Sequence, residues 1–504
     1  MSDLDNTGVV FPLTGEKRSS TAVGRETLAH AADAVDPGLA RRIRATSNWR
    51  KEYLAPARDL VVASAASTAA ADAVAHAGLR YLHDSFEFSD GASSVPLHEA
   101  VAGQTDDELS TRTFIGGGEV DPVLRIPFRG SQLEGSDIRR QVSAWLTHRV
   151  VEPSFAVAIQ RVLDNPEWLD LRGHRFVVLG AGAELGPLAT LLRCGAEVWA
   201  VDLPRPDTWQ RLISLVQGTA GILHVPVPAD SGIGPAHSDD EVAAVAGADL
   251  IRAAPAVARW LSHLDGPLII GNYGYADGAL NVRLSMACDA ISIFLIDTLG
   301  RDQVTLAYLA TPTDAFQVPM EIVDDAREQW RHHLLARFTR RPLALANLFQ
   351  PNYRRLVQQA DGGTVGVADC LIEQQGPNYL LAKRMQRWRA TVCRVDGVHV
   401  SLNVAPSTRT QSVIRNKLMA AAYGGASRFG IEVFEPETCN AVMAALLVRD
   451  LRDPASYANP AVSLDHPADL FSQAAAHGGM WRSPYDPRSV LKAAAVLGMI
   501  EQSM

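Results

Sequence analysis

Tyr379 and Lys383 stand four residues apart in the segment GPNYLLAKRMQRWRA. The chain has 10 tyrosines and only five lysines, so this spacing arises by chance only about 0.1 times in the whole length. On a helix, residues four apart share a face. An ammonium group beside a phenol lowers the tyrosine pKa from about 10, and such a tyrosine can exchange the proton that accompanies hydride transfer. The alternative is an ordinary aromatic–lysine packing pair.

A glycine-rich segment, VVLGAGAELGPLATLL, places Gly180, Gly182 and Gly186 after a short apolar run. Such glycines allow a tight turn, close approach of a pyrophosphate and close helix packing, and the N-terminus of the next helix favours the anion. Asp202 ends the next apolar run, where a carboxylate can accept a hydrogen bond from a ribose hydroxyl. We therefore predict dinucleotide binding, with NAD favoured because Asp202 would repel a 2′-phosphate; Arg205 keeps NADP as the second option. The alternative is a structural glycine turn that holds another ligand, such as a methyltransferase cofactor.

From residue 171 onward, apolar runs typical of buried strands alternate with helix-like segments. This alternation predicts an α/β fold with a doubly wound, Rossmann-like parallel sheet over residues 171–504. A helix of about ten residues is expected directly after the glycine turn. The other predicted strands lie in GILHVPV, GPLIIGNYG, QVTLAYLATPTD and VHVSLNVAPST, and the other predicted helices in NVRLSMACDAISIFLIDTLG, PNYLLAKRMQRWRATVCR and EPETCNAVMAALLVRDL.

Two regions lie outside this pattern. Residues 1–170 are predicted to be mainly helical, with one long helix over GSDIRRQVSAWLTHRVVEPSFAVAIQRVLDN that begins at Ser136 or Asp137. The turn-rich segment FIGGGEVDPVLRIPFRG predicts a short hairpin or a lid. The segment from about 315 to 370 is too long for one connection, and we interpret it as a helical insertion near the edge of the sheet that carries the active site.

The motifs and their order resemble the short-chain dehydrogenase/reductase superfamily. In that family a Tyr-x-x-x-Lys helix is followed by a strand and a loop like NVAPSTRT, and the first strand enters a glycine turn like VVLGAGAELG. The resemblance covers about 174–315 and 370–450. It implies that Tyr379 is the general acid/base of a reversible hydride transfer between NAD(H) and a carbonyl or alcohol. It also implies that Lys383 lowers the pKa of Tyr379 and holds the nicotinamide ribose.

The resemblance implies further site residues. Asn272 and Gly274, in GNYGYADG after the fourth predicted strand, would form the floor of the cofactor site, where the family often has Asn-Asn-Ala-Gly. Thr311 or Thr313, in LATPTD after the next strand, would orient the substrate oxygen in place of the family's serine, because a threonine hydroxyl makes the same hydrogen bonds.

The loop NVAPSTRT would contribute Pro406 and Thr410 to the cofactor site, with Ser407 in place of the usual glycine. The sequence departs from the family in three other ways. Glu184 stands where the phosphate turn usually has its middle glycine, with Gly182 nearby. The family's helix asparagine has no counterpart in SMACDAISIFLIDTLG, and the insertion lengthens the spacing between the threonines and the tyrosine.

Three other segments invite a chemical interpretation. His332 and His333 are adjacent, so on a helix they would point in different directions, and no metal site is predicted. His477, in AHGGMWR, is interpreted as part of a structural turn, with a polar position in the substrate pocket as the alternative. FIGGGEV resembles an oxyanion loop, but the absence of G-x-S-x-G excludes a serine hydrolase of that type.

Composition restricts the partners. The chain has 504 residues, 47% of them hydrophobic, and a net charge of -9, which disfavours nucleic acid. The N-terminus is acidic, so no secretory signal is predicted. No membrane span is predicted either, because no uncharged apolar run reaches about 18 residues. The five scattered cysteines are typical of reduced thiols in a cytoplasm and argue against disulfides and zinc. A small-molecule substrate is the expected partner, and a homo-oligomer is compatible with the fold.

The predicted function is therefore an NAD(P)-dependent oxidoreductase. Two alternatives keep the nucleotide. In an epimerase or dehydratase with tightly bound NAD, the hydride would return to the substrate. In a non-catalytic nucleotide-binding scaffold the site would be degenerate, which Glu184 and the missing asparagine favour.

Overall fold

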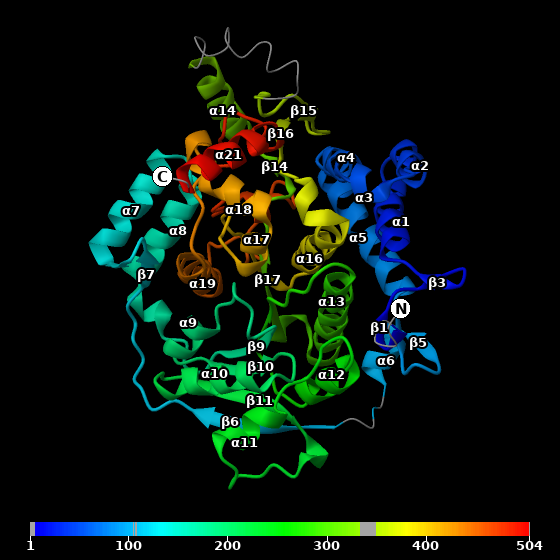
Figure 1. Cartoon of the computed structure of the whole chain (residues 1–504), viewed down its shortest axis with the longest axis vertical. Coiled ribbons are helices and arrows are strands. Elements are labelled where there is room, and N and C mark those ends of the chain that lie inside the picture. The colour runs from blue at the N-terminus through cyan, green and yellow to red at the C-terminus, as the bar shows by residue number, and fades with distance from the viewer. Residues whose placement is uncertain (1–5, 104, 106–107, 333–348, 503–504) are drawn as a thin grey trace.

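The structure is a computed structural model that describes residues 6–103, 105, 108–332 and 349–502. A seven-stranded sheet lies at its centre (Figure 1). Six of the strands are parallel, and one edge strand is antiparallel. In spatial order the strands are β17 (His399–Val404), β13 (Val304–Ala310), β12 (Leu268–Asn272), β9 (Arg175–Leu179), β10 (Glu197–Val201), β11 (Ile222–Pro228) and β6 (Leu109–Ile115).

The strand order reverses between β9 and β12. From β9 the chain steps outward to β10 and β11, and it then returns to the other side of β9 to form β12, β13 and β17. The sequences of these parallel strands are nearly continuous apolar runs because helices cover both faces of the sheet. The strand order and directions confirm the predicted α/β fold with a mostly parallel central sheet.

Side chains of each strand point alternately into two hydrophobic cores. Val177 and Leu179 belong to one core, and Phe176 and Val178 to the other. The first core is covered by α12 (Ala254–Ser262), α13 (Ala279–Leu299) and α16 (Gly376–Val395), with α1 (Ser20–Asp33) and α5 (Thr68–Ser85) packed beyond them. The second is covered by α8 (Pro153–Asp164), α9 (Leu188–Arg193), α10 (Pro206–Gln217) and α19 (Pro436–Arg452).

Residues 1–170 share these cores and are not only helical. They supply the antiparallel edge strand β6, which pairs with β11 along its whole length. They also form a three-stranded sheet of β1 (Gly8–Val10), β4 (Glu87–Ser89) and β5 (Ser94–Pro96). The expected hairpin exists as β7 (Arg125–Phe128) and β8 (Ser131–Glu134), whereas the Phe-Ile start of that segment belongs to β6. The remaining elements are β2 (Leu13–Thr14), β3 (Lys17–Arg18), α2 (Pro37–Arg44), α3 (Trp49–Glu52), α4 (Leu54–Ser64) and α6 (Leu97–Ala102).

The single long helix predicted after residue 135 is wrong. Two helices replace it, α7 (Gly135–Thr147) and α8. Arg149 has a φ of 60°, a left-handed conformation that ends a helix. Pro153 then begins α8, where its missing N–H costs nothing. The expected cap at Ser136 or Asp137 is also wrong, because Glu134 precedes the first helical residue.

The insertion is partly β-structure, and only part of it is helical. It contains β14 (Ala315–Val318), α14 (Met320–His332), β15 (Leu356–Gln358) and β16 (Thr364–Asp369), with the strands in the antiparallel order β14-β16-β15. His332 is exposed at the end of α14, and His333 lies outside the described residues. One more helix, α11 (Asp239–Val245), follows β11. The helices that follow β17 include α17 (Gln411–Arg415), α18 (Lys417–Gly424), α20 (Asp469–Ser472) and α21 (Pro487–Gln502).

Among the described helices, α13 is long and apolar enough to cross a membrane, with a mean hydropathy of 1.6 over its most apolar window. In the structure 72% of that window is buried inside the protein. The helix is not an uncharged run, because Arg283 and Asp289 lie within it. Both of these charged residues are buried. All five cysteines are buried free thiols.

Candidate functional site

The predicted site residues lie at the carboxyl ends of β9, β12, β13 and β17. Gly180 follows β9 with a φ of 89°, which favours glycine. A Cβ atom on Gly180 would lie 2.4 Å from the Cα of Gly274, which follows β12. The turns after β9 and β12 therefore touch where the strand order reverses, which is where α/β sheets bind ligands.

Tyr379 lies in the first turn of α16, at this same edge. Its ring contacts the ring of Tyr275 edge-on, with the two centroids 6.2 Å apart. The Thr311 hydroxyl lies close enough to the phenol to oppose part of the rise in pKa that burial causes. The hydroxyls of Thr311 and Thr313 are 2.9 Å apart. The structure thus brings together three of the residues that the sequence singled out: Tyr379, Thr311 and Thr313.

Lys383 points to the end of β13. Its Nζ atom donates to the carbonyl of Leu309 and to Oε1 of Gln386, both at 3.1 Å. Burial lowers the pKa of Lys383 to about 8. Burial also raises the pKa of Tyr379 to about 12, against the smaller effect of Thr311. The prediction that Lys383 lowers the pKa of Tyr379 is therefore wrong for this state, because burial dominates and the ammonium is bound to other acceptors.

Asp202 ends β10 and closes the glycine turn. Its Oδ2 atom accepts from the N–H of Gly182 at 2.7 Å, and its Oδ1 atom accepts from the N–H of Leu203 at 2.8 Å. A Cβ atom on Gly182 would lie 2.9 Å from Cγ2 of Thr208. Gly182 is therefore required by packing within the protein, and the carboxylate predicted to bind a ribose stands next to the glycine turn.

The helix after the glycine turn is shorter than predicted. The sequence predicts about ten residues directly after the turn, but α9 has six and begins at Leu188. Pro187 explains the delay, because a proline disfavours helical geometry in the residue before it, here Gly186. A Cβ atom on Gly186 would meet its nearest neighbour at 3.4 Å, so no close helix packing requires this glycine. The predicted anion site at the helix N-terminus is therefore not formed next to Gly182.

Glu184 joins the glycine turn to the segments after β17. Its Oε2 atom accepts from the N–H of Gln411, the first residue of α17, at 2.9 Å. Its backbone carbonyl accepts from Nδ2 of Asn440, in α19, at 2.8 Å. We call these two contacts of Glu184, with Gln411 and Asn440, the clasp. The clasp therefore ties the glycine turn to α17 and α19 at the carboxyl edge of the sheet.

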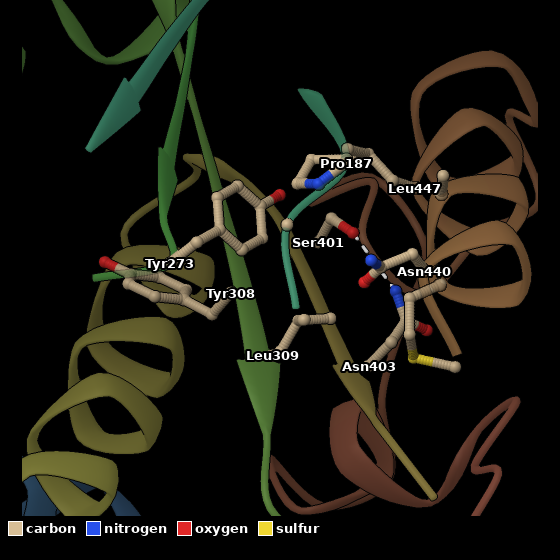
Figure 2. Close-up of a pocket in the computed structure, with 11 residues that line it drawn as sticks. Pro187, Tyr273, Tyr308, Leu309, Ser401, Asn403, Asn440 and Leu447 are labelled. Carbon is tan, nitrogen blue, oxygen red and sulfur yellow. Dashed lines mark hydrogen bonds between the residues drawn. The ribbon is translucent and has the colours of Figure 1, made fainter. Parts of the chain in front are cut away.

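A small cavity lies next to the clasp, between the sheet and α19. Figure 2 shows Asn440 with Ser401 and Asn403 of β17 on one side and Tyr273 on the other. The volume is about 10 Å³, room for one water molecule. A cavity of this size does not hold a nucleotide.

Ser401 and Asn403 explain the polar positions of β17. The Ser401 hydroxyl and the Asn403 amide both donate to Oδ2 of Asp450 in α19, at 2.7 and 2.8 Å. Polar and apolar residues partly alternate in VHVSLNV. The polar ones belong to this buried network next to the cavity, and the strand does not face solvent.

The remaining predicted cofactor residues also lie at this edge. Asn272 is buried at the end of β12, and Pro406 is buried after β17. Thr410 precedes α17, and its hydroxyl lies 3.0 Å from that of Ser412. Among the described residues, the Asp202 carboxylate accepts hydrogen bonds from Gly182 and Leu203 and from none of these three, so the structure brings them to the edge without joining them to the glycine turn.

Several residues of the site escape sequence reasoning. Tyr275 is 51% exposed and forms the rim above Tyr379, although it stands within the predicted segment GNYGYADG. Tyr423 of α18 lies close enough to raise the pKa of Tyr379 through repulsion between the phenolates. No sequence pattern could have identified Gln411 and Asn440 as site residues, because their contacts with Glu184 span more than 200 positions of the chain.

His477 belongs to a structural turn, as interpreted from the sequence. Its Nε2 atom lies 2.8 Å from Oε1 of Glu152, and its Nδ1 atom accepts from the N–H of Gly479 at 2.9 Å. Arg482 completes the group by donating to both carboxylate oxygens of Glu152. His477 is fully buried and serves this ion-paired cluster.

No model of a known protein family matches the sequence, and no curated protein matches it significantly. Function is therefore inferred from the residues at the carboxyl edge of the sheet.

Proposed function

We propose that this protein binds NAD(H) between the carboxyl ends of β9 and β12 and catalyses hydride transfer to or from a carbonyl or alcohol substrate. Tyr379 is the general acid/base. The observation that carries the proposal is the meeting of Tyr379, Thr311 and Lys383 at the ends of β13 and α16, on the edge that also bears the glycine turn. Phenol, hydroxyl and ammonium together suit proton transfer at a carbonyl oxygen.

The topology supports a doubly wound, Rossmann-like domain. Numbered from β9 along the chain, the parallel strands lie in the order 6-5-4-1-2-3, and helices cover both faces. The glycine turn follows the first of these strands and the threonines follow the fifth. The Tyr-x-x-x-Lys helix precedes the sixth, and NVAPSTRT follows it. This is the element order that the resemblance to short-chain dehydrogenases/reductases leads one to expect.

Each residue has a defined role in this proposal. Tyr379, with its pKa raised to about 12, carries its proton at neutral pH and donates it during carbonyl reduction. Thr311 orients the substrate oxygen and keeps the phenol aligned. Lys383, with its pKa lowered to about 8, is still mostly charged at pH 7 and binds ribose hydroxyls. Asp202 accepts from the adenosine ribose. The bound nicotinamide supplies or receives the hydride.

Nucleotide entry requires the clasp to open. The Glu184–Gln411 hydrogen bond is exposed at the surface, so water replaces it at little cost. Movement of the five-residue α17 would break this contact without unfolding either core, and the hydrogen bond from Asn440 of α19 to the Glu184 carbonyl must break as well. The mobile element proposed here is therefore α17, and the sheet is the rigid part.

Tryptophan fluorescence tests the binding step. Trp209 donates to the carbonyl of Leu203, next to Asp202, so it reports on this site. We expect saturable quenching by NADH and weaker quenching by NADPH. Asp202→Asn keeps one acceptor oxygen, and it should weaken NADH binding about tenfold and narrow the preference over NADPH. Failure of both nucleotides to bind protein shown to contain no bound nucleotide would contradict the proposal.

A carbonyl-substrate screen tests the chemistry. Tyr379→Phe should bind NADH like the wild type but lose at least about 100-fold in turnover. Tyr423→Phe is the matched control, since it removes a neighbouring phenol that has no proposed proton-transfer role. Equal activity of Tyr379→Phe and the wild type would favour the non-catalytic scaffold.

A second candidate, an NAD-dependent epimerase or dehydratase, is favoured by the clasp itself. If Glu184 contacts Gln411 and Asn440 again after a nucleotide has entered, the clasp would retain that nucleotide between turnovers. Nucleotide released from the purified protein by denaturation, identified by its absorbance and mass, would support this candidate over a dehydrogenase that exchanges its cofactor.

A further inference from the structure

A four-residue segment, 311–314, carries both threonines of the proposed site and ends in a buried aspartate. It joins β13 of the central sheet to β14 of the insertion, and we call it the connecting segment. Asp314 is fully buried, which is rare for an aspartate unless its charge is paired. The hydride transfer proposed above gives this carboxylate no role.

Two arginines of α16 pair with Asp314. Arg384 donates to the carboxylate through Nε and Nη2 at 2.6 to 3.0 Å, and Arg387 donates to Oδ2 at 2.7 Å. We call these contacts the anchor. Burial favours protonation of Asp314, but the two guanidiniums hold its pKa below the usual value. The carboxylate is therefore charged, and a forked contact of this kind fixes orientation as well as distance.

The helix α16 also contacts the chain on both sides of the connecting segment. Lys383 donates to the last carbonyl but one of β13 at 3.1 Å, and Arg387 donates to the carbonyl of Ala315 at 2.9 Å. Between these two contacts, the Thr311 hydroxyl lies close to the phenol of Tyr379. The path of the connecting segment along α16 therefore decides where the threonine hydroxyl lies.

Aromatic rings hold Arg387 in place. Its guanidinium lies 4.1 Å from the ring centroid of Phe316 and 4.9 Å from that of Phe471, positions in which a cation is attracted to the ring. Stability alone does not explain the anchor, because buried ion pairs can often be replaced by apolar side chains without loss of stability. The forked geometry instead supplies a defined position for the residues next to Asp314.

We propose that Asp314 is a positioning residue of the site. Its two arginine partners fix the connecting segment on α16, and this keeps the Thr311 hydroxyl against the Tyr379 phenol. The inference rests on the proposed hydride transfer, in which the threonine holds the substrate oxygen at the proton of the tyrosine. A displacement of about 1 Å in such a site can cost about 100-fold in rate. Asp314 itself does not touch the substrate.

Steady-state NADH oxidation with the best substrate of the carbonyl screen tests the catalytic effect. Asp314→Asn should lower kcat about tenfold or more and change the KM for NADH by less than about twofold. Asp289→Asn is the matched control, because this carboxylate is also buried and bound to an arginine of α16, Arg389. It should lose comparable stability and keep its kcat. Equal loss of kcat in both variants would reduce the anchor to a structural ion pair and overturn the proposal.

A double-mutant cycle tests whether the anchor acts through Thr311. Thr311→Val removes the hydroxyl, so adding Asp314→Asn to it should lower kcat by less than about threefold further. A second loss as large as that of Asp314→Asn alone would overturn the proposal.

Arg384→Lys provides a variant that keeps the positive charge beside Asp314. An ammonium cannot form the forked contact, so we expect a folded protein whose kcat is about threefold to tenfold lower. An unchanged kcat in Arg384→Lys would overturn the proposal even if Asp314→Asn did not fold.

Hydrogen exchange measured by mass spectrometry tests the anchor independently of any reaction. The N–H of Ala315 donates to Oδ1 of Asp314 at 2.7 Å. Arg384→Lys and Asp314→Asn should therefore speed exchange in peptides from 311–318 and leave β9 and β10 unchanged. If the wild type reduced no carbonyl, the hydride transfer would fail, whereas faster local exchange would still support the anchor. Unchanged exchange in 311–318 would overturn the anchor whichever reaction the protein catalyses.

Discussion

The ammonium of Lys383 illustrates a conflict between burial and function at the scale of a single residue. It is half-buried and donates to the carbonyl of Leu309 and to Oε1 of Gln386, and no carboxylate of the described residues forms an ion pair with it. Burial therefore lowers its pKa to about 8. The protein therefore tolerates the charge of this lysine at some cost in stability.

This cost predicts a specific pH dependence of stability. A lysine with a lowered folded-state pKa destabilises the fold fully below pH 8, and the penalty disappears as the pH rises towards the ordinary value of 10.5. We expect the unfolding temperature of Lys383→Met, relative to the wild type, to fall as the pH rises from 7 to 10. The change corresponds to roughly 1–3 kcal/mol. Thermal unfolding at several pH values measures it, and parallel curves for the two proteins would contradict the assigned burial.

At the scale of elements, the decisive contact joins a turn to a short helix. The glycine turn does not run directly into α9, and Glu184 instead contacts the first N–H of α17. A carboxylate is favourable at a helix N-terminus, so this contact stabilises the closed position of α17. The same carboxylate would repel the pyrophosphate of the proposed nucleotide.

Both effects predict that Glu184→Ala binds NADH more tightly, by about threefold to tenfold. The fluorescence titration proposed for the wild type measures this. Glu437→Ala is the matched control, because it removes an exposed carboxylate from the first turn of the neighbouring α19 without breaking the clasp. Unchanged or weaker NADH binding in Glu184→Ala would show that the clasp does not obstruct the nucleotide.

At the scale of the whole molecule, a buried ion cluster fastens the N-terminal region to the rest of the fold. Asp289 of α13 accepts two hydrogen bonds from Arg389 of α16, at 2.9 and 2.8 Å, and lies 2.7 Å from Nε2 of His83 in α5. Burial favours protonation of Asp289, but Arg389 and His83 together hold its pKa well below the usual value. The cluster therefore contributes stability above pH 4, and this contribution is lost in acid.

Asp289→Asn should destabilise the protein by about 3–5 kcal/mol, because it leaves the buried Arg389 without a counter-charge. Thermal unfolding should show a fall of several degrees at pH 7. Asp297→Asn, on an exposed position of the same helix, is the control and should leave the unfolding temperature unchanged. An equally small effect of both substitutions would mean that the cluster does not fasten α5 to α13 and α16.

The sequence by itself determined the local elements and the candidate residues. Apolar runs identified the parallel strands, and the spacing of Tyr379 and Lys383 placed both on one helix, because such patterns depend on residues that are neighbours in the chain. It failed where a single residue overrode the pattern, as Pro187 did for α9 and Pro153 for the helix predicted after residue 135. The β-structure of the insertion was also missed, since short strands give weak periodicity.

Only the tertiary structure decided what each group contacts. It bound the Lys383 ammonium to the carbonyl of Leu309 at the end of β13, and it joined Glu184 to the first residue of α17. The Glu184 contact joins positions 227 residues apart, and such pairs depend on strand order and on which core each helix covers. These choices minimise the free energy of the whole chain, so no local pattern of residues encodes them.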